Sequence, residues 1–197
     1  SFQLHLQVPF DLAGRYYNAS LICCAPLLAV AVNSPLLFGQ RLWQETRVPL
    51  FEQSVELGGY AGLAEPTLRR VTFGRGYVAS SLLELFEENL EHYPVLLPMP
   101  LAEPPSRYPH LRLHNGAIWR WVRPLIGFDA AGQAHVRLEQ RVLPSGPTVL
   151  DMIANAALNF GLVHALARRS RAAEADLPFA VARANFYAAA RHGLQAE

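Results

Sequence analysis

Residues 2–8 alternate between apolar and polar side chains. The apolar residues take the even-numbered positions, and Gln3, His5 and Gln7 stand between them. Because successive side chains of a β-strand point to opposite faces of its sheet, this pattern predicts a strand with one polar face. Pro9 ends the strand, since proline has no N–H to donate to a neighbouring strand. Taken alone, His5 is more typical of a polar residue in a half-buried strand than of a ligand.

A second alternating stretch, residues 134–143, predicts another strand of the same kind, and the rest of the chain can be organised around it. Its apolar face holds Val136, Leu138 and Val142. Its polar face holds one carboxylate between two guanidinium groups, with an imidazole at the start: His135, Arg137, Glu139 and Arg141.

Two interpretations of this polar face are open. In the first, it is the solvated outer face of an antiparallel sheet, where cross-strand ion pairs contribute little stability. In the second, it is the floor of an active site. Glu139 would then hold a metal ion, and Arg137 and Arg141 would hold phosphate or carboxylate, which guanidinium groups bind with paired hydrogen bonds. The alternation alone favours the first interpretation.

Longer apolar stretches predict helices between the strands. Asp11 and Thr148 are suitable N-cap residues for two of them, and Gly193 is a suitable stop for the last. The helices at 11–32 and 148–169 are too apolar to be exposed, so we expect both to pack on one face of the sheet. The expected helices are residues 11–32, 79–92, 148–169 and 178–192.

The remaining segments predict a third strand and several loops. Residues 111–123 are expected to form one strand that is interrupted at Asn115-Gly116, or two strands, and residues 129–133 form the hairpin turn into the 134–143 strand. The proline-rich residues 94–109 predict an extended loop, and the glycines of residues 58–62 predict a mobile one. The three strands should form one antiparallel sheet, which gives an α+β fold in a single domain over residues 1–197.

Composition narrows the class of protein. Of the 197 residues, 51% are hydrophobic and 17% are charged, and the formal net charge is +1. This near-neutral balance gives no reason to expect nucleic acid or a membrane as a partner. Cys23 and Cys24 are adjacent within an apolar run, which predicts buried thiols and fits a cytoplasmic protein. That run, residues 20–32, is short for a membrane span, and Pro26 interrupts it.

A second dense group of chemically suggestive residues lies in the 111–123 segment. Alternation would place Trp119, Trp121 and Arg123 on one face, where arginine could stack on an indole ring. The polar break at residues 114–116 precedes this group, and such breaks often lie near a site. The group is as typical of a structural contact as of a binding site.

Several segments, in order along nearly the whole chain, resemble one known family. They are residues 3–7, 31–35, Arg47, 114–121, 138–148 and 189–194. The chain resembles the carboxylate–amine ligases related to glutamate–cysteine ligase, in the second glutamate–cysteine synthetase group, whose catalytic fold is that of glutamine synthetase and the guanido kinases. Val122 departs from the pattern, since a polar residue is usual there in close relatives, and this leaves the substrate open.

The resemblance implies a curved antiparallel sheet whose concave face holds magnesium, ATP and an acidic substrate. By match of position, His5 and Glu139 would be metal ligands, and Arg47 and Arg141 would serve catalysis. The residues that would contact substrate or nucleotide are Gln7, Arg47, Trp119, Arg137 and Arg141. This agrees with the second interpretation of the polar face.

The implied reaction is phosphorylation of the carboxylate of glutamate or a similar acid by ATP, followed by attack of an amine on the acyl phosphate. The alternative is a protein of the same fold that has lost the chemistry and only binds a small metabolite or a partner. The strand pattern is already running at Phe2, and the family's earlier acidic metal ligands have no counterpart here. We therefore expect a truncated domain that is inactive alone and that covers its open strand edge as a homodimer.

Overall fold

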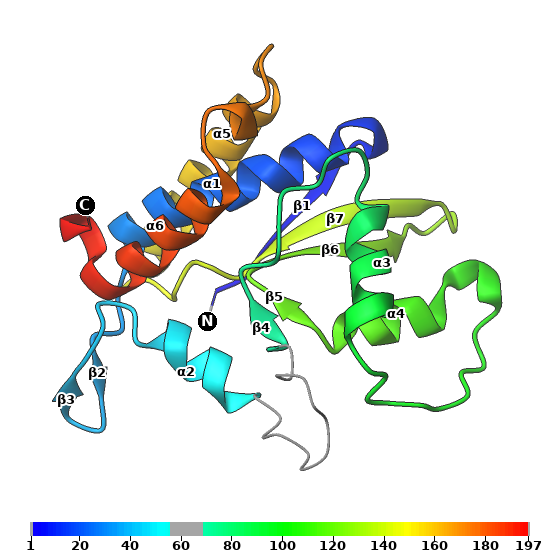
Figure 1. Ribbon diagram of the computed structural model, residues 1–197, viewed down its shortest axis with the longest axis horizontal. Helices are drawn as coiled ribbons and strands as arrows, with labels where there is room; N and C mark the ends of the chain where they lie inside the picture. Colours follow the sequence, from blue (N-terminus) through cyan, green and yellow to red (C-terminus); the bar gives the residue numbers. More distant parts are fainter. Residues whose placement is uncertain (1, 56–68, 197) are drawn as a thin grey trace.

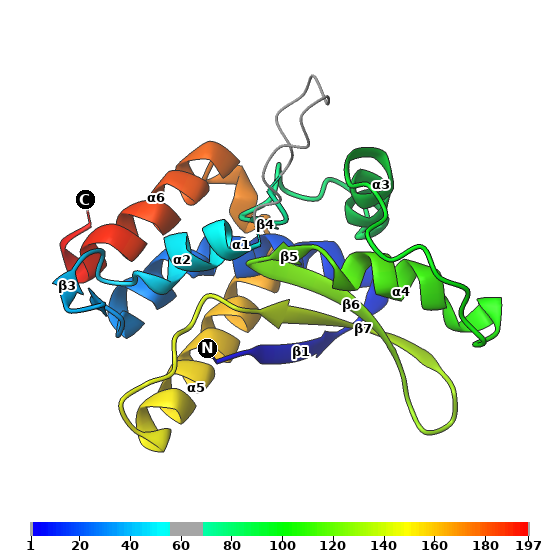
Figure 2. The same ribbon diagram turned by 90° about the horizontal axis from the view of Figure 1, so that it is seen from below.

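A three-stranded antiparallel sheet in the order β1-β7-β6 carries the polar residues singled out above. The structure is a computed structural model that describes residues 2–55 and 69–196, so the glycine-rich residues 58–62 lie outside the described residues. Figure 2 shows the three strands side by side, with helix α1 behind them. The strands are β1 (Leu4–Val8), β6 (Val122–Phe128) and β7 (Ala134–Gln140).

One face of this sheet is apolar and buried, as the alternation predicts. Val136 and Leu138 are buried there, and Gln140 on the same face donates a hydrogen bond of 3.5 Å to the Ser20 carbonyl of α1. Helix α1 (Ala13–Ala31) is the core of the molecule, and α5 (Val149–Ala167) and α6 (Phe179–His192) run alongside it (Figure 1). The prediction of an α+β fold is therefore confirmed.

The other elements are short and lie around this core. Strands β2 and β3 form a hairpin, and β4 pairs in parallel with β5. The elements are β2 (Leu36–Leu37), β3 (Gln40–Arg41), α2 (Arg47–Ser54), β4 (Val71–Thr72), α3 (Leu83–His92), α4 (Pro109–Gly116) and β5 (Trp119–Arg120). Single 3₁₀ turns are η1 (Phe10–Leu12), η2 (Pro105–Arg107), η3 (Ala173–Ala175) and η4 (Gly193–Gln195).

The predicted strand at residues 111–123 is wrong over its first half. Residues 109–116 form α4, with Pro109 in the first turn, where its fixed φ suits a helix. The short His-Leu-Arg-Leu-His pattern fits a strand and a helix equally well, which is why the alternation misled. The third strand of the sheet is instead β6, whose hairpin to β7 through Asp129–Gln133 is confirmed.

Two helices differ from their predicted extent or environment. Helix α3 begins at Leu83, later than the expected residue 79, because the Glu84 carboxylate accepts backbone N–H bonds from Ala79, Ser80 and Ser81 and folds them into a turn. Helix α1 starts after η1, and the side chain of Asp11 caps neither element. The last helix is confirmed, with Gly193 at φ 60° after its end.

Helix α5 is capped as predicted but is not buried as predicted. Thr148 and Asp151 form a reciprocal capping box at its start. It packs on α1 along one narrow stripe, whereas Leu150 is 78% exposed and Ile153 is 60% exposed. By length and composition alone, α5 is long and apolar enough to cross a membrane. Helices in the cores of other proteins meet the same criterion.

Candidate functional site

Glu139 is the centre of the polar face of the sheet. The register places it between His5 of β1 and Arg123 of β6, and Arg141 follows just beyond the end of β7. The Oε2 atom of Glu139 accepts hydrogen bonds from Nε of Arg123 and Nε of Arg141, both at 2.9 Å, and the Nη2 atoms of these arginines lie 2.8 and 2.7 Å from it in ion pairs. Two guanidinium groups therefore converge on one carboxylate oxygen.

The second oxygen of Glu139 faces a different set of groups. His5 Nε2 lies 3.5 Å from Oε1, and the His5 side chain is 36% exposed. In the amide orientation that satisfies both of its hydrogen bonds, Gln3 donates to Oε1 at 3.0 Å and accepts from Arg141 Nη1 at 2.7 Å. The Oε1 side of the carboxylate is thus the side covered by the two exposed residues Gln3 and His5.

Burial decides between the two interpretations of the polar face. The Glu139 side chain is 4% exposed, and those of Arg123 and Arg141 are 8% and 11% exposed. A solvated outer face is therefore wrong for this part of the sheet. Burial lowers the pKa of Arg123, Glu139 counteracts that effect, and Arg141 adds to it. With two guanidinium groups on one carboxylate, the cluster favours a further anion.

Arg123 is held in place by the end of α4. Its Nη1 atom donates to the carbonyls of Asn115 and Gly116 at 3.2 and 3.1 Å, and the buried Asn115 amide donates to the Pro124 carbonyl at 2.8 Å. The polar residues at 114–116 do adjoin the site, although they end a helix where a break in a strand was expected.

Arg47 fixes the chain that follows β7. Its Nε atom donates to the fully buried Glu45 at 3.1 Å, and Nη1 and Nη2 donate to the carbonyls of Arg141 and Val142 at 3.2 and 2.5 Å. Glu45 also accepts from the Asn33 N–H and the Ser34 hydroxyl, which accounts for the position of that segment. Burial lowers the pKa of Arg47, and the Glu45 carboxylate counteracts this effect.

The predicted common face of Trp119, Trp121 and Arg123 is wrong. One strand ends at Arg120 and the next begins at Val122, so the alternation breaks at Trp121. Trp121 is fully buried and donates to Glu52 Oε1 at 3.0 Å. The arginine over its ring is Arg47, 5.4 Å from the ring centroid.

Two predicted site residues lie further along the sheet. Gln7 is exposed and is paired in register with Arg137, two positions from the Glu139 pair. Arg137 is half-buried and lines a cavity of about 210 Å³ together with Asn115 and Leu125. Val122, the departure from the family pattern, is fully buried in the core, so it does not face the cluster.

A cavity of about 710 Å³ opens beside the cluster and brings three of the predicted residues together. Guanidinium and amide groups share its lining with apolar side chains. The lining residues are Gln3, Arg47, Leu50, Phe51, Ser54, Val55, Trp119 and Arg141.

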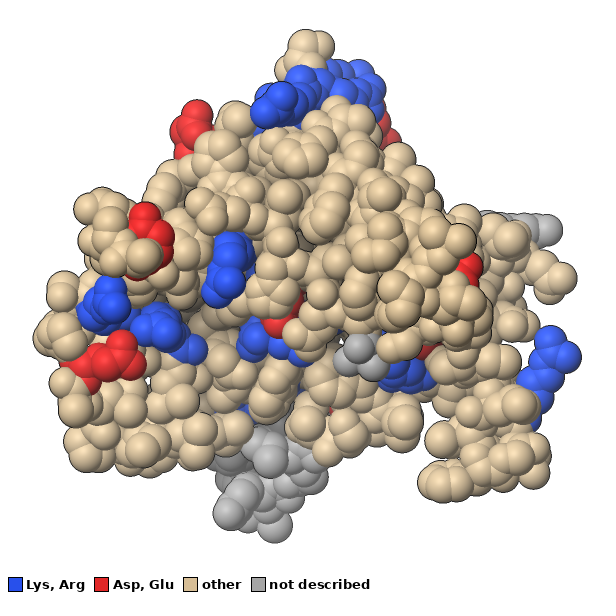
Figure 3. All heavy atoms as spheres, turned by 180° about the vertical axis from the view of Figure 1, so that it is seen from behind, with Lys and Arg blue, Asp and Glu red and all other residues tan. Residues whose placement is uncertain are grey.

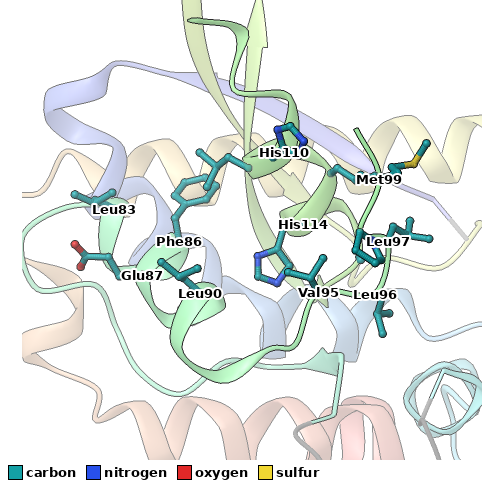
Figure 4. A pocket seen from close by; sticks show the side chains of 14 residues that line it. Leu83, Phe86, Glu87, Leu90, Val95, Leu96, Leu97, Met99, His110 and His114 are labelled. Carbon is teal, nitrogen blue, oxygen red and sulfur yellow. The ribbon is translucent and has the colours of Figure 1, made fainter. Parts of the chain in front are cut away.

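A second hollow, of about 600 Å³, lies between α3, residues 95–99 and α4 (Figure 4). Its lining is apolar apart from Glu87, His110 and His114, and His114 Nε2 is 3.0 Å from the Tyr93 carbonyl. Its described lining includes none of the predicted site residues. The view from behind shows a largely uncharged surface with small groups of both signs (Figure 3).

Sequence reasoning missed Gln3, Arg123 and Glu45 as members of the site. Gln3 shares the strand parity of His5, which is a signal that could have found it. Arg123 could be found only from the register of β6 against β7. Among residues 2–55 and 69–196, no group of three or more His, Cys, Asp or Glu side chains is placed to hold a metal ion, so His5 and Glu139 form a pair.

The whole chain matches one known protein family. The model of glutamate–cysteine ligase family 2 matches residues 1–197, the whole chain. The chain belongs to glutamate–cysteine ligase family 2. No curated protein matches it. Membership confirms the resemblance drawn from the sequence segments and indicates a ligase of the glutamate–cysteine ligase type.

Proposed function

We propose that the protein is an ATP- and magnesium-dependent carboxylate–amine ligase that acts on glutamate or a similar acid. The observation that carries this proposal is the asymmetric environment of Glu139. Its Oε2 atom is occupied by Arg123 and Arg141, whereas its Oε1 atom faces Gln3 and His5, two exposed residues without a formal positive charge when the imidazole is neutral. The chain described here would supply part of the catalytic domain of a cytoplasmic enzyme.

In the proposed reaction, a substrate carboxylate oxygen attacks the γ-phosphorus of ATP, and the bond from phosphorus to the bridging oxygen breaks to release ADP. The amine nitrogen then attacks the carbonyl carbon of the acyl phosphate. The carbon–oxygen bond breaks, inorganic phosphate leaves, and the amine loses a proton. Neither step needs a protein nucleophile, so the protein has to position the reactants and neutralise charge.

The residues present fit two ligands of a magnesium site. His5 Nε2 and Glu139 Oε1 lie 3.5 Å apart on the same face of the sheet. Magnesium prefers oxygen ligands, which Glu139 supplies and the His5 nitrogen does not. It also keeps several waters and substrate phosphate oxygens, so it does not need a complete set of protein ligands. When bound, the metal would neutralise phosphate charge.

The arginines would hold the anionic groups of the reactants. Arg141 lines the cavity beside the cluster and lies against Glu139, which suits it to a transferring phosphoryl group. Arg47 lines the same cavity and would contact a phosphate or the substrate carboxylate. Trp119 would contact the substrate there, and Gln7 and Arg137 would contact it or the nucleotide along the sheet.

One observation supports a second candidate, a protein that binds a small acidic metabolite without turning it over. Both guanidinium groups at Glu139 are already paired with it, and within the described residues no third carboxylate or imidazole joins His5 and Glu139. A binding protein would need only the anion-binding capacity of the arginines.

Hydroxylamine separates these two candidates because it traps acyl phosphates as hydroxamates. The full-length protein is incubated with ATP, magnesium, glutamate and hydroxylamine, and hydroxamate and ADP are measured. A ligase forms both in equal amounts, and a binding protein forms neither while still showing heat of binding for glutamate. His5→Gln should raise the magnesium concentration needed for half-maximal rate at least tenfold. His110→Gln, outside the cluster, should leave that concentration unchanged.

A further inference from the structure

The cavity beside the Glu139 cluster has two kinds of wall. Arg47, Arg141 and Gln3 supply hydrogen-bond donors and charge, whereas Leu50 and Phe51 of α2 supply apolar surface. Leu50 is 47% exposed, so its side chain is in contact with solvent where the cavity opens. A cavity of about 710 Å³ is within the range of about 300–1,000 Å³ typical of small-molecule sites.

The apolar wall is larger than a small polar acceptor would cover. It is made of Leu50, Phe51 and Val55 with the indole of Trp119. The ring of Phe51 is held edge-on against Trp121, with centroids 5.8 Å apart, so this wall is anchored to the core. Removing such a surface from water is favourable only for a ligand that carries apolar surface of its own.

Arg47 retains donors for a carboxylate at the edge of this wall. A guanidinium group has five N–H donors, and three of those of Arg47 bind Glu45 and the carbonyls of Arg141 and Val142. The remaining donors are on Nη1 and Nη2, in a side chain that is 18% exposed and lines the cavity. Guanidinium N–H donors form charge-assisted hydrogen bonds with a carboxylate.

We infer that this cavity binds the amine acceptor, and that the acceptor is an α-amino acid or a similar amine with a bulky aromatic or branched side chain. Its carboxylate would be held by Arg47 and its side chain would lie against Phe51, Leu50 and Trp119. The inference rests on the proposed ligase function. It implies that phenylalanine or leucine is a better acceptor than glycine or cysteine, whose side chains would leave most of the wall uncovered.

The test compares acceptors in the full-length protein with ATP, magnesium and glutamate. We expect kcat/KM for phenylalanine or leucine to exceed that for glycine and cysteine at least tenfold. Phe51→Ala should lower the ratio of kcat/KM for phenylalanine to that for hydroxylamine at least tenfold. Phe10→Ala is the matched control, because Phe10 is 65% exposed and lies outside the cavity, and it should leave the ratio unchanged.

A second variant guards against loss of folding, since Phe51 also packs on Trp121. Leu50→Gln places a polar group on the same wall at a half-exposed position and should lower the ratio in the same direction. If hydroxamate forms but glycine or cysteine is the preferred acceptor, the inference about the cavity is overturned and the ligase function stands. If neither hydroxamate nor ADP forms, the ligase function itself is overturned and the inference with it.

Discussion

Glu139→Gln tests how the site is built, because the change removes one charge and almost no volume. Shape alone suggests that glutamine is tolerated. However, the Glu139 side chain is 4% exposed, and both Arg123 and Arg141 bind its Oε2 atom within 2.9 Å. The substitution leaves two guanidinium groups in a largely dry environment without their counter-ion.

The expected loss of stability is large. Removing one partner from a buried ion pair costs about 3–5 kcal/mol. A protein of this size loses about 2–4 °C in Tm per kcal/mol, so Glu139→Gln should lower Tm by about 6–20 °C. Because a typical free energy of unfolding is about 5–15 kcal/mol, the variant should remain folded at low temperature. It should nevertheless lose all magnesium-dependent turnover, because the proposed metal ligand is gone.

The measurement is urea denaturation at pH 7, followed by tryptophan fluorescence, since Trp121 is fully buried. Glu103→Gln is the matched control: Glu103 pairs with Arg112 at 3.2 Å, but both side chains are at least 40% exposed, so the loss should be below about 1 kcal/mol. Adding Arg123→Met to Glu139→Gln should recover part of the stability, because one uncompensated charge is removed. A loss for Glu139→Gln no larger than that of the control would refute the reasoning.

Three other predictions follow from the described contacts. Backbone N–H bonds lower the pKa of Glu84 to about 2. The contribution of Glu84 to folding stability is therefore present above the unfolded-state pKa of about 4.3 and is lost as pH falls toward 2. Glu84→Gln should therefore be about 1 kcal/mol less stable than wild type at pH 7, and equal stabilities at pH 7 would contradict this. Burial raises the pKa of the Cys23 thiol to about 12 and that of Cys24 well above its usual value, so iodoacetamide should modify both only in denaturant. If a second copy covers the exposed face of α5, which has no Lys or Arg over its length, Ile153→Glu should convert a concentration-dependent dimer to a monomer in sedimentation experiments.

The sequence predicts those elements whose pattern depends only on local chemistry. Residues 2–8 and 134–143 alternate because each strand has one face against α1 and one face away from it, so parity alone places His5 and Glu139 on polar faces. The helix from Thr148 was predicted from its cap. In contrast, α4 occupies a segment whose five-residue pattern fits both helix and strand, and its end is tied to β6 by a hydrogen bond from the Asn115 amide to the Pro124 carbonyl, which no local pattern encodes.

Members of the site that depend on register could not be predicted in this way. Arg123 faces Glu139 because β6 begins at Val122, and a shift of one residue would turn Arg123 to the opposite face. Alternation counted from Trp119 places Arg123 beside Trp119 and Trp121. That prediction is wrong because it assumes one unbroken strand. Arg47 reaches the chain after β7 through contacts that are far apart in sequence, which no local pattern encodes.

The way in which Glu139 is paired is the strongest argument that this cluster does more than stabilise the fold. A buried ion pair is weak evidence for stability, because well-packed apolar residues of similar volume often stabilise a protein as much or more. Arginine–carboxylate pairs frequently use both carboxylate oxygens, with two parallel N–H···O bonds. Here two arginines converge on Oε2, and Oε1 faces Gln3 and His5 instead of a guanidinium group. This arrangement fixes the carboxylate and leaves Oε1 beside a neutral amide and an imidazole, which is the side on which a metal ion would bind.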